Sequence, residues 1–324
     1  MNIVLGNWRI LSESEIRMKP QYTQNKGFFC SLTWLLQCLP YIDNDIINKK
    51  NVGFSFYSHN YGSYPNFSVF GKHLITKFPS LPCPEESIDI KEIFKVNYKS
   101  LEDNFQYAHD LFFKYFDFSN DIYIESKSIS DLFINKKTLG LHFRGTDKVN
   151  VNWADHTSAD DFLSIVDDYL SKHSVDCIFF CTDSLYFKNK IIDKYSNIYT
   201  LHYNKNNNLT DNALHLSRLS AIENTIKGIK YKYMTEEKLK QECTINEEEL
   251  KSVIMDSIIL SRCSTVIKTH SLVSCFSKII NPSLEIYRIN GCSEVYYPES
   301  YIPFYTTNNA NIQKILNRSK RLPY

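Results

Sequence analysis

Polar residues able to hold a negatively charged ligand stand directly after an apolar, strand-like run in the second half of the chain. The segment His142–Lys148 reads HFRGTDK, and the alternation of side chains along a strand puts His142 and Arg144 on one side. Arg144 offers a fixed cation whose planar fork suits phosphate oxygens, and Gly145 permits close approach of a ligand to the backbone. An arginine–aspartate pair that closes the loop after the strand is the alternative, and spacing alone leaves both interpretations open.

Two further polar clusters follow strand-like runs and stand where helices are expected to begin. Thr182–Ser184 (TDS) comes after the apolar run CIFFC, and Thr269–Ser271 (THS) comes after STVIK. Hydroxyls and backbone amides at a helix N-terminus bind anions, although each cluster is also compatible with ordinary helix capping. The carboxyl ends of parallel strands meet at one edge of a sheet, so the three clusters together favour a ligand site there.

Alternating strands and helices must position these clusters. The expected strands are Lys137–Phe143, Asp176–Thr182, Ile198–Tyr203, Thr265–Lys268 and Glu285–Ile289. The expected helices are Ser158–Lys172, Asp183–Lys194, Glu247–Leu260 and one that begins at Leu272. This alternation predicts a parallel sheet with right-handed crossovers, as in a Rossmann-like α/β domain.

The alternation of strand-like and helix-like segments is less regular in the first half of the chain. We expect a buried helix at Phe28–Leu39, a strand at Val52–Tyr57, a loop at Ser58–Gly71 and a helix at Leu101–Phe118. A chain of 324 residues exceeds what one core usually organises. We therefore expect two domains, residues 1–130 and residues 131–324, with about the last 20 residues packing back on the first domain.

Composition and charge exclude several classes of partner. The formal net charge of +1 gives no field that would attract nucleic acid, so no nucleic-acid partner is expected. Apolar runs such as Cys177–Cys181 are far shorter than the roughly 20 residues that span a bilayer, and the N-terminal residues lack the pattern of a secretion signal. Nine scattered cysteines without a CxxC pair indicate neither a zinc site nor a disulfide framework. These features predict a cytoplasmic protein, at most peripheral at a membrane, without a transmembrane segment.

The three clusters and their flanking residues resemble the motifs of a known enzyme family. HFRGTDK, FFCTDS and DSIILSRCSTVIKTHSLVSC are similar to the three motifs of the α1,6-/α1,2-/protein O-fucosyltransferase superfamily, nearest to its core and nodulation-factor α1,6 branch. The likeness covers about residues 137–280, and GFFCSLTWLLQCL (Gly27–Leu39) resembles the opening segment of bacterial relatives.

The resemblance implies a fold and an activity. The fold would be GT-B, in which two Rossmann-like domains face a cleft, with the acceptor on the side of residues 1–130 and the nucleotide sugar on the parallel sheet of residues 131–324. The activity would be that of an inverting, metal-independent glycosyltransferase that passes fucose from GDP-fucose to a glycan acceptor in surface-glycan synthesis. No cofactor would be needed beyond the donor substrate.

A donor-binding set follows when the family motifs are carried over residue by residue. Arg144 would hold the donor β-phosphate, His142 would contact the nucleotide end, and Asp183 would lie near the nucleoside side of the cleft. Asp256, placed at the start of the helix before the third motif, would orient that region. The complete expected donor-binding set is His142, Arg144, Asp183, Ser184, Asp256, Thr269, His270 and Ser271.

The chain departs from the family pattern at two positions of the first motif. That motif reads roughly HxRRTDK, and Gly145 stands in place of its second arginine; Asn152 stands where an acid is expected four positions after the lysine. Two alternatives therefore stay open. One is a GT-B transferase that uses another nucleotide sugar, and the other is a catalytically inactive carbohydrate-binding homologue.

The expected chemistry is displacement of a nucleoside diphosphate. Arg144 and helix-end donors would stabilise the charge that develops on the leaving group. Asp147 and Asp155 are the candidate bases for the acceptor hydroxyl, with Lys148 and His156 as alternatives.

The acceptor side is less well marked in the sequence. Tyr61 and Tyr64, in the aromatic loop SHNYGSYPNFS, are the candidate acceptor-binding residues. The sequence does not indicate an oligomeric state.

Overall fold

The computed structural model describes residues 2–5, 28–48, 53–56, 73–77, 87–89, 101–145, 157–204, 247–291 and 297–319. These residues belong to two compact units. Unit 1 comprises the described residues up to Tyr123 together with residues 247–253, and unit 2 comprises those from Ile124 to 204 and from Ile254 onward. The division after Tyr123 falls within helix α5 (Asn120–Ser130). The assignment of an acceptor domain and a donor domain stays a prediction.

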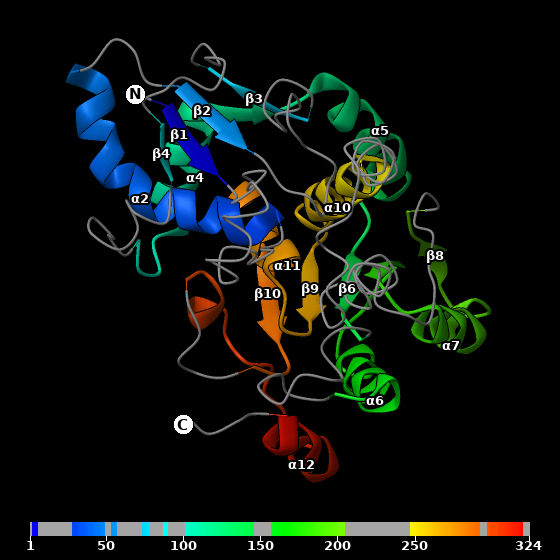
Figure 1. The fold of residues 1–324 in the computed structure, drawn as a ribbon. Coiled ribbons are helices and arrows are strands. Elements are labelled where there is room, and N and C mark those ends of the chain that lie inside the picture. The colour runs from blue at the N-terminus through cyan, green and yellow to red at the C-terminus, as the bar shows by residue number, and fades with distance from the viewer. Residues whose placement is uncertain are drawn as a thin grey trace, which may run out of the picture. The chain divides into compact units, whose positions relative to one another are not determined.

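Unit 2 is built on a parallel sheet of five strands in the order β10-β9-β6-β7-β8 (Figure 1). The strands are β6 (Thr138–Phe143), β7 (Cys177–Thr182), β8 (Thr200–His202), β9 (Thr265–Lys268) and β10 (Glu285–Arg288). The chain adds β7 and β8 on one side of β6 and later adds β9 and β10 on its other side. The order thus reverses beside β6, and ligands of open α/β sheets bind at such a switch point.

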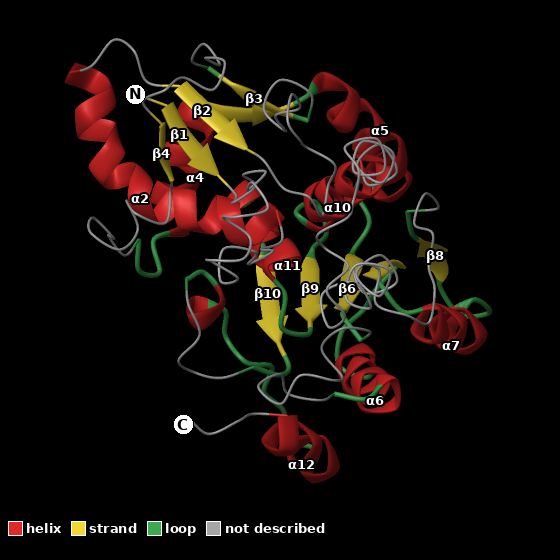
Figure 2. Cartoon of the chain, in the orientation of Figure 1, coloured by secondary structure: helices red, strands yellow, loops and turns green. Residues whose placement is uncertain are grey.

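One face of this sheet is covered by α6 (Ala159–Leu170), α7 (Leu185–Tyr195) and α12 (Ala310–Ser319). Alternate residues of β6, namely Leu139, Leu141 and Phe143, point into the apolar core between the strands and these helices. The hydroxyl of Ser158 caps α6 by accepting a hydrogen bond from the Asp161 amide at 3.0 Å, as its sequence predicts. The core therefore consists of apolar strand residues covered by amphipathic helices. Figure 2 shows the helices and strands of this unit.

The opposite face carries α11 (Leu272–Ile280) and the end of α10 (Glu247–Leu260), whose residues from Ile254 onward belong to unit 2. These two helices are joined by the Ser277 hydroxyl, which donates to the Ser257 carbonyl at 2.8 Å. Gly140 allows the close packing beneath them, because a Cβ there would lie 2.9 Å from Val266 Cγ2 and 3.1 Å from Leu260 Cδ2. The second residue set of β6, which includes His142, faces this side.

Unit 1 contains a parallel sheet in the order β2-β1-β4 and a separate antiparallel pair of β3 and β5. The strands are β1 (Asn2–Leu5), β2 (Gly53–Phe56), β3 (Leu74–Thr76), β4 (Ser87–Asp89) and β5 (Phe116–Phe118). Helix α2 (Phe28–Asn48) contacts β1 and α4 (Phe105–Tyr115). The chain is thus an α/β protein with a parallel sheet in each unit.

The expected elements of the second half are confirmed within two residues at each described end, whereas the first half needs corrections. The helix expected over Leu101–Phe118 ends at Tyr115, and β5 then pairs with β3. The reason is a change of period, since buried Phe116 and Phe118 flank half-buried Asp117 in strand alternation. The helix expected at Phe28–Leu39 continues to Asn48.

The end of the chain is helical in a segment for which no element was expected. The described part of the last residues forms α12, which packs on α6 within unit 2. No helix among the described residues combines the length and apolar character needed to cross a membrane.

Candidate functional site

The carboxyl ends of β6 and β9 are joined by two hydrogen bonds. The Thr269 amide donates to the His142 carbonyl at 2.9 Å, and the Arg144 amide donates to Thr269 Oγ1 at 2.8 Å. Both bonds extend the parallel register in which His142 pairs with Lys268. The first and third motif clusters are therefore adjacent at the switch point of the sheet.

The carboxyl end of β7 brings the second cluster to the same edge. The Gly145 amide donates to Asp183 Oδ1 at 2.9 Å. Ser184 caps α7 by accepting a hydrogen bond from the Phe187 amide at 3.2 Å, and its own amide donates to Thr182 Oγ1 at 3.1 Å. The three clusters thus meet, as expected from their positions after parallel strands, although capping accounts for part of the second.

His142 is a buried, neutral imidazole in this arrangement. Its Nδ1 lies 2.7 Å from Ser274 Oγ of α11, and the Ser274 hydroxyl lies within hydrogen-bond distance, 3.3 Å, of the Ser271 carbonyl. Burial lowers the pKa of His142 to about 3, with smaller contributions from the charges of Lys268 and Arg144. A neutral imidazole has one donor and one acceptor nitrogen, so His142 binds as a polar group and not as a cation.

The N-terminus of α11 is held at the same edge. Ser271 caps the helix by accepting a hydrogen bond from the Val273 amide at 3.3 Å. The His270 amide donates to Asn290 Oδ1 at 2.6 Å, and Asn290 Nδ2 donates to Thr157 Oγ1 at 3.1 Å. The loop between β9 and α11 is thereby tied to the end of β10, and the helix dipole favours an anion beside it.

A buried charged group lies directly behind this loop. Lys268 Nζ donates to both carboxylate oxygens of Glu299 at 2.6 Å, and the exposed fractions of the two side chains are 0% and 1%. The Cys275 thiol donates to the same carboxylate, and His270 Nδ1 lies 3.5 Å from Glu299 Oε1. Burial alone would raise the pKa of the Glu299 carboxyl, but the charges of Lys268 and His270 hold it well below its usual range.

His270 was expected to belong to the site, whereas Lys268, Cys275 and Glu299 were not. The signal for Lys268 was present, since a lysine inside the apolar run STVIK must either leave the core or find a buried partner. Its partner Glu299 is 31 positions later in a segment without periodicity, so the pairing could not be predicted from the sequence. Ser274 carried a weaker signal, because it stands three positions after the helix cap.

Gly145, which replaces the family's second arginine, lies where a side chain does not fit. A Cβ at this position would be 2.4 Å from Phe143 Cε1. The Phe143 ring is held by stacking on Phe187, with ring centroids 4.3 Å apart, and by edge contact with Phe162 at 5.4 Å. The packing of the aromatic core beneath the site therefore favours glycine at this position, and an arginine would require that core to shift.

Asp256 lies in the second half of α10, so its expected position at the start of that helix is wrong. Its side chain is buried. Burial is the main cause that raises the pKa of the Cys181 thiol, and the charges of Asp256 and Asp183 add to it. Both carboxylates therefore act on the end of β7, which keeps Asp256 near the second cluster.

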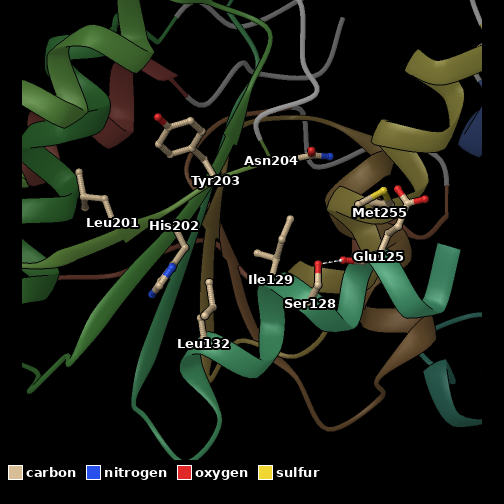
Figure 3. A pocket seen from close by; sticks show the side chains of 9 residues that line it. All are labelled: Glu125, Ser128, Ile129, Leu132, Leu201, His202, Tyr203, Asn204 and Met255. Carbon is tan, nitrogen blue, oxygen red and sulfur yellow. Dashed lines mark hydrogen bonds between the residues drawn. The ribbon is translucent and has the colours of Figure 1, made fainter. Parts of the chain in front are cut away.

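A cavity of about 440 Å³ lies elsewhere in unit 2, between α5, β8 and α10 (Figure 3). Its lining is mostly apolar, with a few polar groups. The lining residues are Glu125, Ser128, Ile129, Leu132, Leu201, His202, Tyr203, Asn204 and Met255. None of the expected site residues lines it, so this cavity does not coincide with the edge where the three clusters meet.

Several expected residues lie outside the described part of the chain. These are the catalytic candidates Asp147, Lys148 and Asp155, the alternative base His156, the substituted position Asn152, and the acceptor candidates Tyr61 and Tyr64. Their roles stay predictions. Within the described ranges, no group of three or more His, Cys, Asp or Glu side chains is arranged to hold a metal ion.

Comparison with known proteins gives a distant structural likeness. No protein-family model and no curated protein sequence matches this chain. Among solved structures, NodZ α1,6-fucosyltransferase soaked with GDP-fucose aligns over 87% of this chain and 92% of that chain, with 11% identity and a TM-score of 0.47. The fucosyltransferase NodZ from Bradyrhizobium aligns over 87% and 93%, with 12% identity and a TM-score of 0.48. At TM-scores below 0.5, fold and activity have to be argued from the residues of this chain.

Proposed function

We propose that the chain is a glycosyltransferase of the fucosyltransferase type, which transfers fucose from GDP-fucose to a hydroxyl of a glycan acceptor. The observation that carries the proposal is the meeting of three motif clusters at the switch point of the unit 2 sheet. The Arg144–Thr269 and Gly145–Asp183 hydrogen bonds hold the clusters together. The clusters are the segments that resemble the motifs of the fucosyltransferase superfamily.

The donor diphosphate would bind between Arg144 and the N-terminus of α11. Arg144 supplies two parallel N–H groups for phosphate oxygens, and the Ser271 cap with the first amides of α11 supplies further donors. Both stabilise negative charge more strongly as it develops on the leaving group. In this proposal these groups supply the positive potential that other transferases take from a divalent cation, which makes transfer metal-independent.

The nucleoside would bind to the polar groups beside the diphosphate. Neutral His142 offers one donor and one acceptor nitrogen, and the Asp183 and Asp256 carboxylates near the end of β7 offer acceptors. A carboxylate can accept from the adjacent N1–H and N2–H groups of guanine together, whereas uracil presents a single N–H and cytosine a single amino group. This complementarity favours GDP over UDP or CMP.

The acceptor hydroxyl would attack from the face opposite the diphosphate, with inversion at the anomeric carbon. Its proton would pass to a base, for which Asp147 and Asp155 are the candidates. We place the reaction in the cytoplasm, on a growing surface glycan.

The first test is calorimetric binding of GDP, with UDP, CMP and ADP as comparators, in the presence of EDTA. We expect GDP to bind preferentially and Arg144→Ala to weaken it about ten- to hundredfold, the equivalent of one hydrogen bond to a charged group. The substitution keeps the Arg144 backbone bond to Thr269. Arg318→Ala is the matched control, because among the described residues Arg318 forms an exposed ion pair with Asp161, and its loss should leave binding unchanged.

The outcomes separate the alternatives. Preference for another nucleotide would replace fucose by a different donor sugar. GDP binding without release of GDP from GDP-fucose, across a panel of glycan acceptors, would favour a catalytically inactive binding protein. If none of the nucleotides binds to the wild type, the donor site and the transferase proposal are wrong.

A further inference from the structure

Four side chains meet behind the β9–α11 loop in a group that we call the Glu299 cluster: Lys268, His270, Cys275 and Glu299. The Glu299 carboxylate accepts from Lys268 Nζ through both oxygens at 2.6 Å, and it also accepts from the Cys275 thiol. His270 Nδ1 completes the group at 3.5 Å. One carboxylate therefore contacts the last residue of β9, the loop that follows it and the first turn of α11.

The carboxylate itself is firmly placed. Glu299 belongs to the 3-10 helix η6 (Glu299–Tyr301), and the segment after η6 is bound to β10. The Arg288 amide donates to the Pro303 carbonyl at 2.9 Å, and the Tyr305 amide donates to the Arg288 carbonyl at 2.9 Å. Glu299 is thus held next to the sheet, whereas His270 lies in the β9–α11 loop. Thr269 and Ser271, the neighbours of His270 in the sequence, belong to the candidate site.

Stability alone does not explain why the Lys268–Glu299 ion pair is buried. Removing two charges from water is costly, and a buried ion pair is often no more stabilising than apolar residues of the same volume. His270 differs from the other members because 20% of its side chain is exposed, which leaves it in contact with both the buried carboxylate and the outside.

We propose that Glu299 is a positioning residue that fixes the His270 imidazole through Nδ1 and makes His270 the second cation of the donor site when a diphosphate binds. This inference rests on the proposed function. With Nδ1–H held by Glu299, Nε2 lies on the far side of the ring and is an acceptor in the neutral form. An arriving diphosphate favours uptake of one proton from solvent at Nε2, and the imidazolium then donates to a phosphate oxygen.

The surroundings of His270 set the balance for this proton. The carboxylate partner of His270, Glu299 from η6, also contacts Lys268 from β9 and Cys275 from α11, and His270 and Arg288 both lie next to Gly291. Glu299 is the only carboxylate among these described groups and is already bound by Lys268.

The variants must remove the contact without leaving a buried charge. Glu299→Met alone would leave Lys268 without its partner, so it is combined with Lys268→Met, which has a similar volume. The matched control is Lys268→Met with Glu299→Gln, which keeps an oxygen atom beside His270 Nδ1 but carries no charge. Thermal unfolding selects the variants that fold, and His270→Gln identifies the signals of His270.

The first measurement is made on the free protein, so it does not depend on any nucleotide. ¹⁵N NMR of the imidazole reports which nitrogen carries the proton of the neutral form. We expect the Nδ1–H tautomer in the wild type and in the Gln control, and a shift toward the Nε2–H tautomer in the Met double variant. An unchanged tautomer in the Met double variant would overturn the positioning role.

The second measurement is calorimetric titration with GDP and with inorganic pyrophosphate, in two buffers of different ionisation enthalpy, near pH 7.5. We expect the wild type to take up, on binding, up to one proton more than His270→Gln, which has no imidazole at this position. Binding without this difference in proton uptake would overturn the second-cation role. If the wild type binds neither ligand, the proposed function and the second-cation role both fall, while the tautomer experiment still decides whether Glu299 positions His270.

Discussion

The two faces of the unit 2 sheet are built on opposite physical principles, although neighbouring residues of one strand supply both. On the α6 and α7 face, Phe143 stacks on Phe187 with ring centroids 4.3 Å apart, inside a core of apolar side chains. On the α10 and α11 face, His142 bonds to Ser274, and Lys268 bonds to Glu299. The switch occurs between residues 142 and 143, because side chains alternate along a strand.

The difference teaches how each face should respond to change. Apolar contacts are non-directional and roughly additive in area, so a loss on the aromatic face should grow with the volume removed. Buried polar groups are satisfied in pairs, so removing one partner leaves the other in a low-dielectric interior without compensation. The two faces can therefore be told apart by whether a second substitution rescues the first.

The largest expected effect is on the polar face. Glu299→Gln should lower the free energy of unfolding by about 3–5 kcal/mol, because it leaves the Lys268 ammonium, which is 0% exposed, without a counter-charge. Adding Lys268→Met should recover most of that stability. Urea unfolding at pH 7 measures the free energy of unfolding of both variants. If the double variant stays as unstable as Glu299→Gln, the ion pair stabilises the fold by more than the compensation of its own buried charges.

On the aromatic face, substitution of the β6 residue Leu141 should lower stability in a way that no second substitution rescues. Leu141→Ala should cost about 2–5 kcal/mol by leaving a cavity beside Phe180 and Ile267, its partners on β7 and β9. No small substitution elsewhere should rescue it, and GDP binding per folded molecule should stay at the wild-type level, as measured by calorimetry after urea unfolding has set the folded fraction. A large change in nucleotide affinity would contradict the separation of the two faces.

The sequence predicted the aromatic face better than the polar one, and the reason is physical. Apolar runs of strand length and helical spacing of Phe162, Ile165 and Val166 are local patterns, so β6, α6 and β7 were found nearly to the residue. In unit 1 the strand expected at Val52–Tyr57 was found as β2. The same method failed where the period changes within one apolar stretch, at Phe116–Phe118, and it missed the short strands β1, β3 and β4.

The site was partly predictable for the same reason. Parallel strands bring their carboxyl ends together, so the meeting of Arg144, Asp183 and Thr269 followed from their places in the chain. The Lys268–Glu299 pair did not follow, because a long-range ion pair leaves no periodic trace in the sequence. The sequence shows that Gly145 departs from the family motif. Only the structure shows that a larger side chain there would clash with the Phe143 ring.

Gly145 lies where the two faces meet, and Gly145→Ala tests both at once. The added Cβ would lie 2.4 Å from Phe143 Cε1, so the ring must move against Phe187 and Phe162. We expect a loss of about 1–3 kcal/mol, the range for overpacking a filled core. Thermal unfolding measures it, and Phe143→Leu in the same background should relieve part of the loss. An unchanged stability would mean that the ring has room to give way.

The smallest expected effect is the pH dependence that His142 gives to stability. Its folded pKa of about 3 lies below the ordinary 6.5, so the unfolded chain takes up the proton first and stability falls as pH drops below 6.5. Between pH 6 and pH 5 this should amount to about 1 kcal/mol. The lowered pKa of Glu299 acts in the same direction only below its ordinary 4.5, so it does not enter this window.

His142→Gln isolates this contribution from that of other histidines, among them His202, whose pKa is also lowered by burial and by Lys136. Urea unfolding at pH 6 and pH 5 should show a slope smaller by about 1 kcal/mol per pH unit in the variant. No counterpart is expected on the aromatic face, where Leu141→Ala should shift stability equally at both pH values. Equal slopes for wild type and His142→Gln would mean that His142 is solvated enough to take up its proton in the folded protein.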